Sequence, residues 1–199
     1  MIKVKTLIVG SLSTNCYLIF DEKTREAIII DPGDDADYIE RVISDLALIP
    51  IKIIVTHGHF DHALAIFELK SAYKIPFCAS KKDEFLLKNI SKSAQFFSKI
   101  KNSFIPKIDI NIKNNDEIIL GKEKLKVIET PGHTPGSLSF YFPESKIAFV
   151  GDIFFADGTL GRCDFKYGDK KELIASVAKI LKLGKRMKVY SGHGPASKT

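Results

Sequence analysis

The stretch Thr56-His57-Gly58-His59-Phe60-Asp61-His62 decides the fold, because it gathers three imidazoles and one carboxylate within six consecutive positions. Neutral imidazole and carboxylate are ligands that zinc, iron and manganese accept. The apolar run 51–55 predicts a strand before this stretch, and apolar residues at helical spacing over 63–73 predict a helix after it. The pattern His-x-His-x-Asp-His therefore falls on a strand-to-helix turn, where α/β folds place their chemistry.

The geometry expected of this turn favours a metal site. His57 and His59 lie two residues apart in extended chain and so point the same way. Asp61 and His62 fall at the start of the predicted helix, where the turning backbone can aim them at a neighbouring point. The plain alternative is a polar loop whose histidines face solvent. Four ligand-type residues in six positions, in a chain with five histidines, argue against that alternative.

The overall composition predicts one globular domain spanning residues 1–199, because 45% of the residues are hydrophobic and 27% are charged. The net charge is +6, but the lysines are interleaved with Asp and Glu, which predicts a solvated basic surface and no nucleic-acid partner. Three cysteines without paired spacing favour a reduced, cytoplasmic protein. We see no signal peptide and no apolar run of membrane-spanning length, so we expect no membrane partner.

The order of the predicted elements indicates the fold class. Strands are expected at 4–9, 16–20, 27–30, 51–55, 76–79, 117–120, 125–129, 137–142, 147–150 and 188–190, and helices at 38–48, 63–73, 82–90 and 170–182. Two runs of strands, each followed by helices, predict an α/β protein with two sheets packed face to face and helices outside. Residues 91–115 are the least regular part, and we interpret them as a partly helical, lid-like excursion over the site or a plain surface insertion.

The other two histidines and one aspartate also follow predicted strands. His133 lies in a loop rich in Gly and Pro after 125–129, His193 lies between two glycines after 188–190, and Asp152 follows 147–150. If these strand ends share one edge of the fold, seven ligands converge there. Seven exceed the number that one ion ordinarily binds. Two ions with one bridging carboxylate and open positions for water fit better, and that is the layout of a two-metal hydrolytic site.

This constellation resembles the metallo-β-lactamase superfamily in its motifs, their order and their broad spacing. The resemblance implies an αβ/βα four-layer sandwich of two mixed sheets, with the metal site on one edge. It also implies that Asp31, in an Asp-Pro-Gly turn, supports the ligand loops. Two divalent ions are implied, with zinc expected and iron or manganese open. The implied ligands are His57, His59 and His133 for one ion, Asp61, His62 and His193 for the other, and Asp152 between them.

Within the superfamily, the chain is most similar to glyoxalase II-like hydrolases, through segments 15–18, 130–137, 151–155 and 161–164. Cys163 departs from that pattern, because Thr or Ser is expected there. Longer members carry a C-terminal helical domain that grips glutathione, whereas this chain has six residues after His193. We therefore expect the short, single-domain type, in which the identity of the thiol carrier is open.

The resemblance implies a dinuclear thioester hydrolase whose substrate is S-lactoylglutathione or a related small acyl-thiol, attacked by a metal-bridging hydroxide. Asp61 and Asp152 would be catalytic as well as ligands, with Asp61 accepting a proton from the nucleophilic water. Arg162, Lys166 and Tyr167 follow the Asp152 loop and are candidates for binding a carboxylate on the thiol carrier, with a solvated loop as the alternative. Phe96 and Phe97 either line the mouth of the site or belong to the core.

Other functions use similar ligands. Persulfide dioxygenases resemble this family and keep the same ligand residues around a single iron, so they are the first alternative. A nuclease of the same superfamily is disfavoured, because those that process tRNA ends generally need a further histidine and a clamp domain. Lactone hydrolysis is a variant of the leading chemistry. A binding protein that has kept its metal core is the last alternative.

Overall fold

The computed structural model describes residues 1–100 and 104–199, whose strands form two six-stranded mixed sheets. The first sheet runs β1 to β6 in chain order, as Ile2–Val9, Thr14–Asp21, Glu26–Ile30, Ile49–Ile54, Phe77–Ala79 and Ile110–Asn111. The second runs β7 to β12, as Glu117–Leu120, Glu123–Glu129, Leu138–Phe142, Ile147–Gly151, Lys188–Ser191 and Ser197–Lys198. The antiparallel β1–β2–β3 pairings give way to parallel pairings from β3 to β6, and β10–β11 is parallel in a sheet that is otherwise antiparallel.

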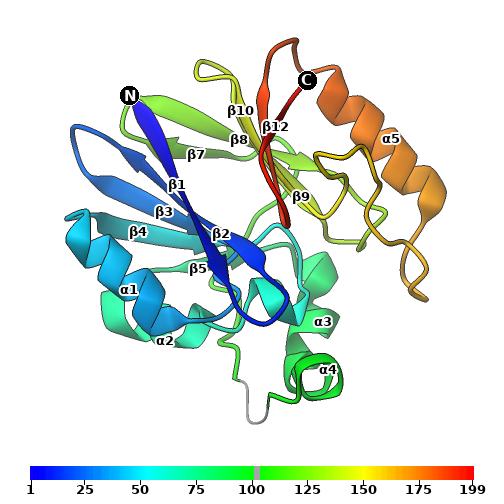
Figure 1. Ribbon diagram of the computed structural model, residues 1–199, viewed down its shortest axis with the longest axis horizontal. Helices are drawn as coiled ribbons and strands as arrows, with labels where there is room; N and C mark the ends of the chain where they lie inside the picture. Colours follow the sequence, from blue (N-terminus) through cyan, green and yellow to red (C-terminus); the bar gives the residue numbers. More distant parts are fainter. Residues whose placement is uncertain (101–103) are drawn as a thin grey trace.

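Five α-helices accompany these sheets in the described residues, at Ala36–Asp45 (α1), Ile66–Tyr73 (α2), Glu84–Lys88 (α3), Ile90–Ser98 (α4) and Lys170–Leu181 (α5). Figure 1 shows α1 and α2 outside the first sheet and α5 outside the second, while α3 and α4 lie together at one end of the molecule. The predicted four-layer sandwich of two mixed sheets with outer helices is confirmed. No helix among the described residues has the length and apolarity that crossing a bilayer requires.

Strand β3 shows why the sheets pack as layers. Side chains alternate across a strand, and every residue from Ala27 to Ile30 is apolar. Ile28 and Ile30 enter the core between the two sheets, while Ala27 and Ile29 enter the core under α1 and α2. Each isoleucine is fully buried, which contributes about 1.5–3 kcal/mol per side chain. A third core lies between the second sheet and α5.

Several predicted elements have different bounds. The helix predicted at 63–73 begins at Ile66, because a 3₁₀ turn over Phe60–His62 precedes it. The helix predicted at 82–90 is a 3₁₀ turn followed by α3, and α4 comes directly after. The excursion expected at 91–115 contains most of α4 and the short strand β6; its residues 101–103 lie outside the described residues. Two-residue strands such as β6 and β12 carry no periodic signal, which is why the sequence did not predict them.

Direct hydrogen bonds join the two sheets at the edge where the ligand loops meet. The backbone N–H of Asn15 donates to Gly192 O at 2.7 Å, and the Asn15 side chain donates to the carbonyls of Ser191 and Gly194. The N–H of Leu138 donates to Thr56 O at 2.7 Å. These bonds fix the ends of β2, β4, β9 and β11 relative to one another, so the loops that follow the strands are held at one place.

Candidate metal centre

All seven predicted ligands lie together at this edge of the sandwich. Their donor atoms form three overlapping groups, and the atoms within each group lie within 4.8 Å of one another. The groups are His57, His59 and His133; His57, His62 and Asp152; and Asp61, His62 and His193. The loops after β4, β8, β10 and β11 supply them. The expectation that these strand ends share one edge is therefore met by the geometry.

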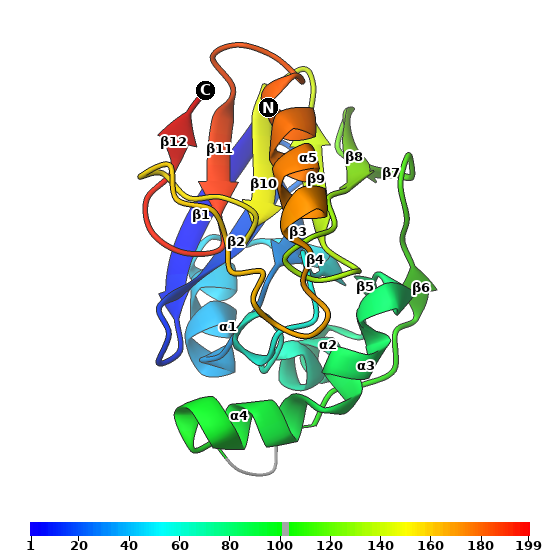
Figure 2. The same cartoon turned by 90° about the vertical axis from the view of Figure 1, so that its right-hand side faces the viewer.

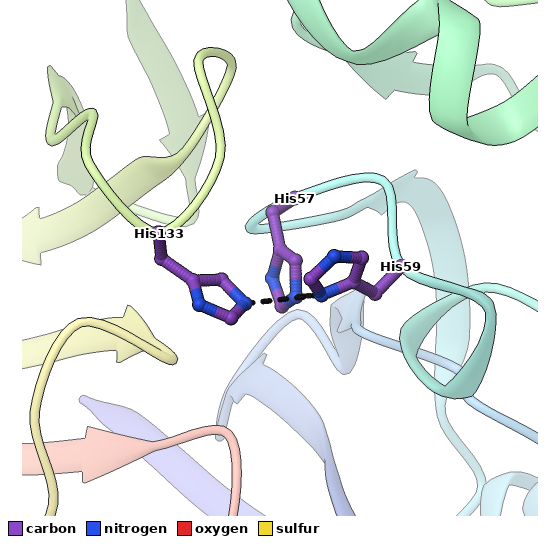
Figure 3. Close-up of side chains that lie close together, drawn as sticks. All are labelled: His57, His59 and His133. Atoms are coloured by element: carbon purple, nitrogen blue, oxygen red, sulfur yellow. Dashed lines mark hydrogen bonds between the residues drawn. The ribbon is translucent and has the colours of Figure 1, made fainter. Parts of the chain in front are cut away.

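The first group is made of three imidazoles from two loops (Figure 3). His59 Nδ1 lies 3.0 Å from His57 Nε2 and 3.0 Å from His133 Nε2. The rings stand nearly perpendicular to one another, with interplanar angles of 82–89°. Three ring nitrogens thus face a common point, as the ligands of one cation do.

The other ring nitrogens are held by partners that set the tautomer. The Arg162 carbonyl lies 2.6 Å from His133 Nδ1, and the Leu12 carbonyl lies 3.1 Å from His193 Nδ1. A carbonyl only accepts, so each of these Nδ1 atoms carries the proton and leaves the lone pair of Nε2 facing the cluster. On His59 the roles are exchanged, because Nε2 contacts the Tyr167 hydroxyl at 2.9 Å and Nδ1 faces the cluster.

Asp31 organises two of the ligand histidines, in keeping with the support role that the resemblance implied. It is fully buried and accepts from the Thr56 N–H at 2.6 Å, from Thr56 Oγ1 at 2.7 Å and from His62 Nδ1 at 3.0 Å. Because Thr56 Oγ1 donates to Asp31, its lone pairs accept from His57 Nδ1, 3.0 Å away. Asp31 therefore orients His62 directly and His57 through Thr56.

The two ligand carboxylates lie between the imidazoles. Asp61 Oδ2 is 3.3 Å from His193 Nε2 and 3.5 Å from His62 Nε2, and it accepts from Thr14 Oγ1 at 3.1 Å. Asp152 Oδ1 is 3.7 Å from His62 Nε2, while its Oδ2 is 3.6 Å from His193 Nε2 and 3.9 Å from His133 Nε2. The two oxygens of Asp152 thus face ligands of both end groups, as a bridging carboxylate does.

The chemistry of these side chains fits divalent cations. His62 Nε2 and Asp152 Oδ1 are buried and make no hydrogen bond within the described part of the chain. Such orphaned atoms cost about 1–3 kcal/mol each, and a cation coordinated by both removes that cost. A Cβ on Gly192 would lie 2.0 Å from Asp152 Oδ1 and 2.7 Å from His62 Cε1, so the space beside these atoms requires a glycine. The donor set of nitrogen and oxygen suits Zn, Fe and Mn.

The electrostatic field of the cluster also favours cations. Burial and the neighbouring imidazoles lower the pKa of His57 far below its usual value and that of His59 to about 3. Burial alone would lower the pKa of His62 too, but the carboxylates of Asp61, Asp152 and Asp31 outweigh it and raise the pKa to about 10. The three carboxylates thus stabilise positive charge at His62 Nε2, and a metal ion supplies that charge as well as a proton does.

Asp83 is a functional residue that the sequence reasoning missed. It is buried, and its carboxylate accepts from Gly58 N at 2.8 Å, Gly136 N at 2.7 Å and Thr134 Oγ1 at 2.6 Å. Gly58 lies between two ligand histidines, and the other two partners, Thr134 and Gly136, follow His133 in the same loop. Burial raises the pKa of Asp83, although these hydrogen bonds oppose the shift. Asp83 therefore joins the two loops that carry the three-imidazole group.

A cavity of about 340 Å³ opens above the cluster. Of the predicted substrate-binding residues, Arg162 and Tyr167 line it, whereas Lys166 is exposed and is not among the lining residues. The Arg162 guanidinium donates to both oxygens of Asp164, at 3.0 and 2.9 Å. Phe97 lines the cavity and Phe96 does not, so one of the two adjacent aromatics reaches the mouth of the site.

Comparisons with known proteins agree with this geometry. The sequence matches the family model described as Metallo-beta-lactamase superfamily over residues 9–193. Hydroxyacylglutathione hydrolase GloC of Haemophilus influenzae is 35% identical and covers 96% of this chain and 90% of its own length. The crystal structure of BLEG-1 B3 metallo-beta-lactamase superimposes with a TM-score of 0.91 at 32% identity, covering 98% of this chain and 94% of that one. TTHA1623 in a di-iron-bound form gives 0.89 at 30% identity, with the same coverage.

Proposed function

Because the chain belongs to the metallo-β-lactamase superfamily, we propose that it is a metal-dependent hydrolase that cleaves the thioester of S-lactoylglutathione or a related small acyl-thiol. The observation that carries the proposal is the convergence of seven ligand side chains, with Asp152 between the two end groups. The likeness to the hydroxyacylglutathione hydrolase GloC supports a thioester as the substrate.

Two divalent ions fit this arrangement. His57, His59 and His133 would hold one, Asp61, His62 and His193 the other, and Asp152 would contact both. Bound ions of this kind polarise a carbonyl oxygen and lower the pKa of a coordinated water to near neutrality. We propose zinc as the metal. Because TTHA1623 has been crystallised in a di-iron-bound form, the metal analysis must also measure iron.

The side chains of this protein would orient the substrate and handle the proton. The neighbouring His62 and His193 hold the pKa of Asp61 well below its usual value, in spite of burial, and a cation beside Asp61 would act in the same direction. Asp61 is therefore ionised at neutral pH and can accept a hydrogen bond from the nucleophilic water. A thiolate is a good leaving group and needs no strong general acid, which agrees with a chain whose five histidines all lie in the cluster.

Tyr167 is suited to bind the substrate directly. Its hydroxyl accepts from His59 Nε2, which carries the ring proton because Nδ1 faces the cluster. Burial raises the pKa of Tyr167, so the phenol stays protonated and its O–H remains available to donate into the cavity. Tyr167 can therefore hold a carbonyl or carboxylate oxygen of the acyl-thiol, with Arg162 at the rim of the same cavity.

The test is metal analysis of purified protein coupled to an S-lactoylglutathione assay. We expect two ions per chain, thioester hydrolysis that chelation abolishes, and loss of most activity in His59→Ala with an unchanged circular dichroism spectrum. One iron per chain, with oxygen consumption on glutathione persulfide and no hydrolysis, would identify the dioxygenase alternative. A holoprotein that is inert toward acyl-thiols, lactones and a chromogenic β-lactam would overturn the assignment to a hydrolase.

A further inference from the structure

The walls of the cavity are apolar on both sides of the metal cluster. On one side, Phe60 lies within the ligand turn between His59 and Asp61, Leu86 comes from α3 and Phe97 from α4. Phe60 and Phe97 stack in parallel, with ring centroids 6.0 Å apart and an interplanar angle of 4°. Phe97 remains 55% exposed although it lies at a binding site, so a ligand in the cavity can bury apolar surface that the fold leaves open.

The opposite wall comes from the loop between Asp152 and α5, and Figure 2 shows this loop extending toward the end of the molecule where α3 and α4 lie. Phe155, Leu160 and Phe165 of that loop line the cavity. A substrate whose scissile bond lies over the cluster has one arm on each side. Because both walls are apolar, the acyl arm meets an apolar wall in either orientation.

The cavity offers the acyl group of a substrate few charged partners. Among its described lining residues, Arg162 is the one with a permanent positive charge. That charge is compensated by the two hydrogen bonds to Asp164, and the guanidinium also lies 4.5 Å from the ring centroid of Phe165. Lys166 lies outside the lining. Apolar contact, more than ion pairing, is therefore what this site offers beyond the metal cluster.

We propose that the preferred substrates are 2-hydroxyacyl or simple acyl thioesters with an aromatic or bulky aliphatic acyl group, and that Phe97 is a residue that determines this preference. The proposal rests on the thioester hydrolysis argued above and names the acyl class within it. A methyl group such as that of the lactoyl unit leaves most of these walls uncovered, whereas a phenyl ring can pack against Phe97 and Leu86. One methylene in an apolar pocket changes kcat/KM by roughly 10–200-fold. Replacing the methyl group with a phenyl group should therefore raise kcat/KM measurably.

The test compares S-mandeloylglutathione with S-lactoylglutathione on the metal-loaded protein. The two thioesters share the carrier and the 2-hydroxyl group and differ only in phenyl against methyl. We expect kcat/KM to be at least about tenfold higher for the mandeloyl substrate, because the phenyl group adds several carbons of apolar contact. In Phe97→Ala this ratio should fall about tenfold.

The control is Phe96→Ala, which removes the adjacent aromatic ring on α4. Phe96 is 80% exposed and lies outside the cavity lining, so the ratio should stay at the wild-type value. Leu86→Ala, on the same wall as Phe97, provides a second lowered ratio if Phe97→Ala does not fold. A wild-type ratio at or below one, or a ratio that neither variant lowers, overturns the inference while thioester hydrolysis stands. Failure to hydrolyse either thioester overturns both.

Discussion

The substitution Asp83→Asn tests whether one buried carboxylate positions the two ligand loops. Asp83 Oδ2 accepts from Gly58 N and Thr134 Oγ1, and its Oδ1 accepts from Gly136 N. An asparagine amide of the same shape presents one oxygen and one NH₂ group. If the NH₂ replaces Oδ1, it faces the Gly136 N–H; if it replaces Oδ2, it faces the Gly58 N–H. In either orientation one buried backbone donor loses its acceptor.

The expected loss of stability follows from this one unpaired backbone donor. One unpaired buried N–H costs about 1–3 kcal/mol, which lowers the melting temperature of a domain of this size by roughly 2–12 °C. The unpaired donor belongs to a residue beside His57 and His59 or to the loop that carries His133. A shift of such a loop misdirects the three imidazole nitrogens, and the loss of an orienting partner around a metal costs about 10–100-fold in metal affinity.

Thermal unfolding of the chelated protein measures the first effect, and competition with a chromophoric chelator measures the second. The matched control is Glu84→Gln, which removes a carboxylate from the next residue in the chain. Glu84 pairs with exposed Lys88 at 3.2 Å, so its loss should cost less than about 0.5 kcal/mol. If Asp83→Asn matches the control in both stability and metal affinity, the positioning role is refuted. A drop in stability alone would limit Asp83 to a structural role.

Three further predictions concern the metal cluster and the N-terminal strands. Chelation of the bound metal should lower the melting temperature without unfolding the protein, since one site loaded at about 1,000 times its Kd contributes roughly 4 kcal/mol. Gly192→Ala should abolish metal binding in an equilibrium titration, because its Cβ would lie 2.0 Å from Asp152 Oδ1; normal stoichiometry would contradict the assigned geometry. Hydrogen bonds from the Thr24 N–H, the N-terminal amine and Lys23 lower the pKa of Asp21 to about 2. Its stabilisation is therefore present above about pH 4 and lost toward pH 2, so the melting temperatures of wild type and Asp21→Asn should converge in that window.

The ligand cluster could be predicted from the sequence because its signal is local and chemical. Four ligand-type residues in six positions have few other uses, and Gly-rich loops after strands point to the rest. Asp83 gives no such signal. Its partners lie 25, 51 and 53 residues away, and an aspartate before Glu84 at a helix start has the appearance of a solvated cap. Its role depends on three distant segments meeting, which the local pattern does not contain.

The aromatic pair on α4 shows a second limit of sequence reasoning. Phe96 and Phe97 are chemically identical neighbours, and consecutive side chains of a helix point about 100° apart. Only one of them can face the cavity, and the rotation of α4 about its own axis decides which one. This rotation is the phase of α4 relative to the ligand turn. That phase is set by the stacking of Phe97 on Phe60 and by the hydrogen bond from Ser11 Oγ to Ser98 Oγ at 3.0 Å, which links α4 to the β1–β2 turn.

The hydrogen bonds that close the site edge explain why this protein should fold before it binds metal. Asn15 contacts the backbone of Ser191, Gly192 and Gly194, and Leu138 N donates to Thr56 O, all without using a donor atom of the cluster. The two sheets also share a core of buried aromatic and aliphatic residues. In small domains that lack such a core, metal binding and folding are one event. Here the edge is already closed, so ions would enter a site whose ligands are held in place, and the folded apoprotein should take up two equivalents with little change in its circular dichroism spectrum.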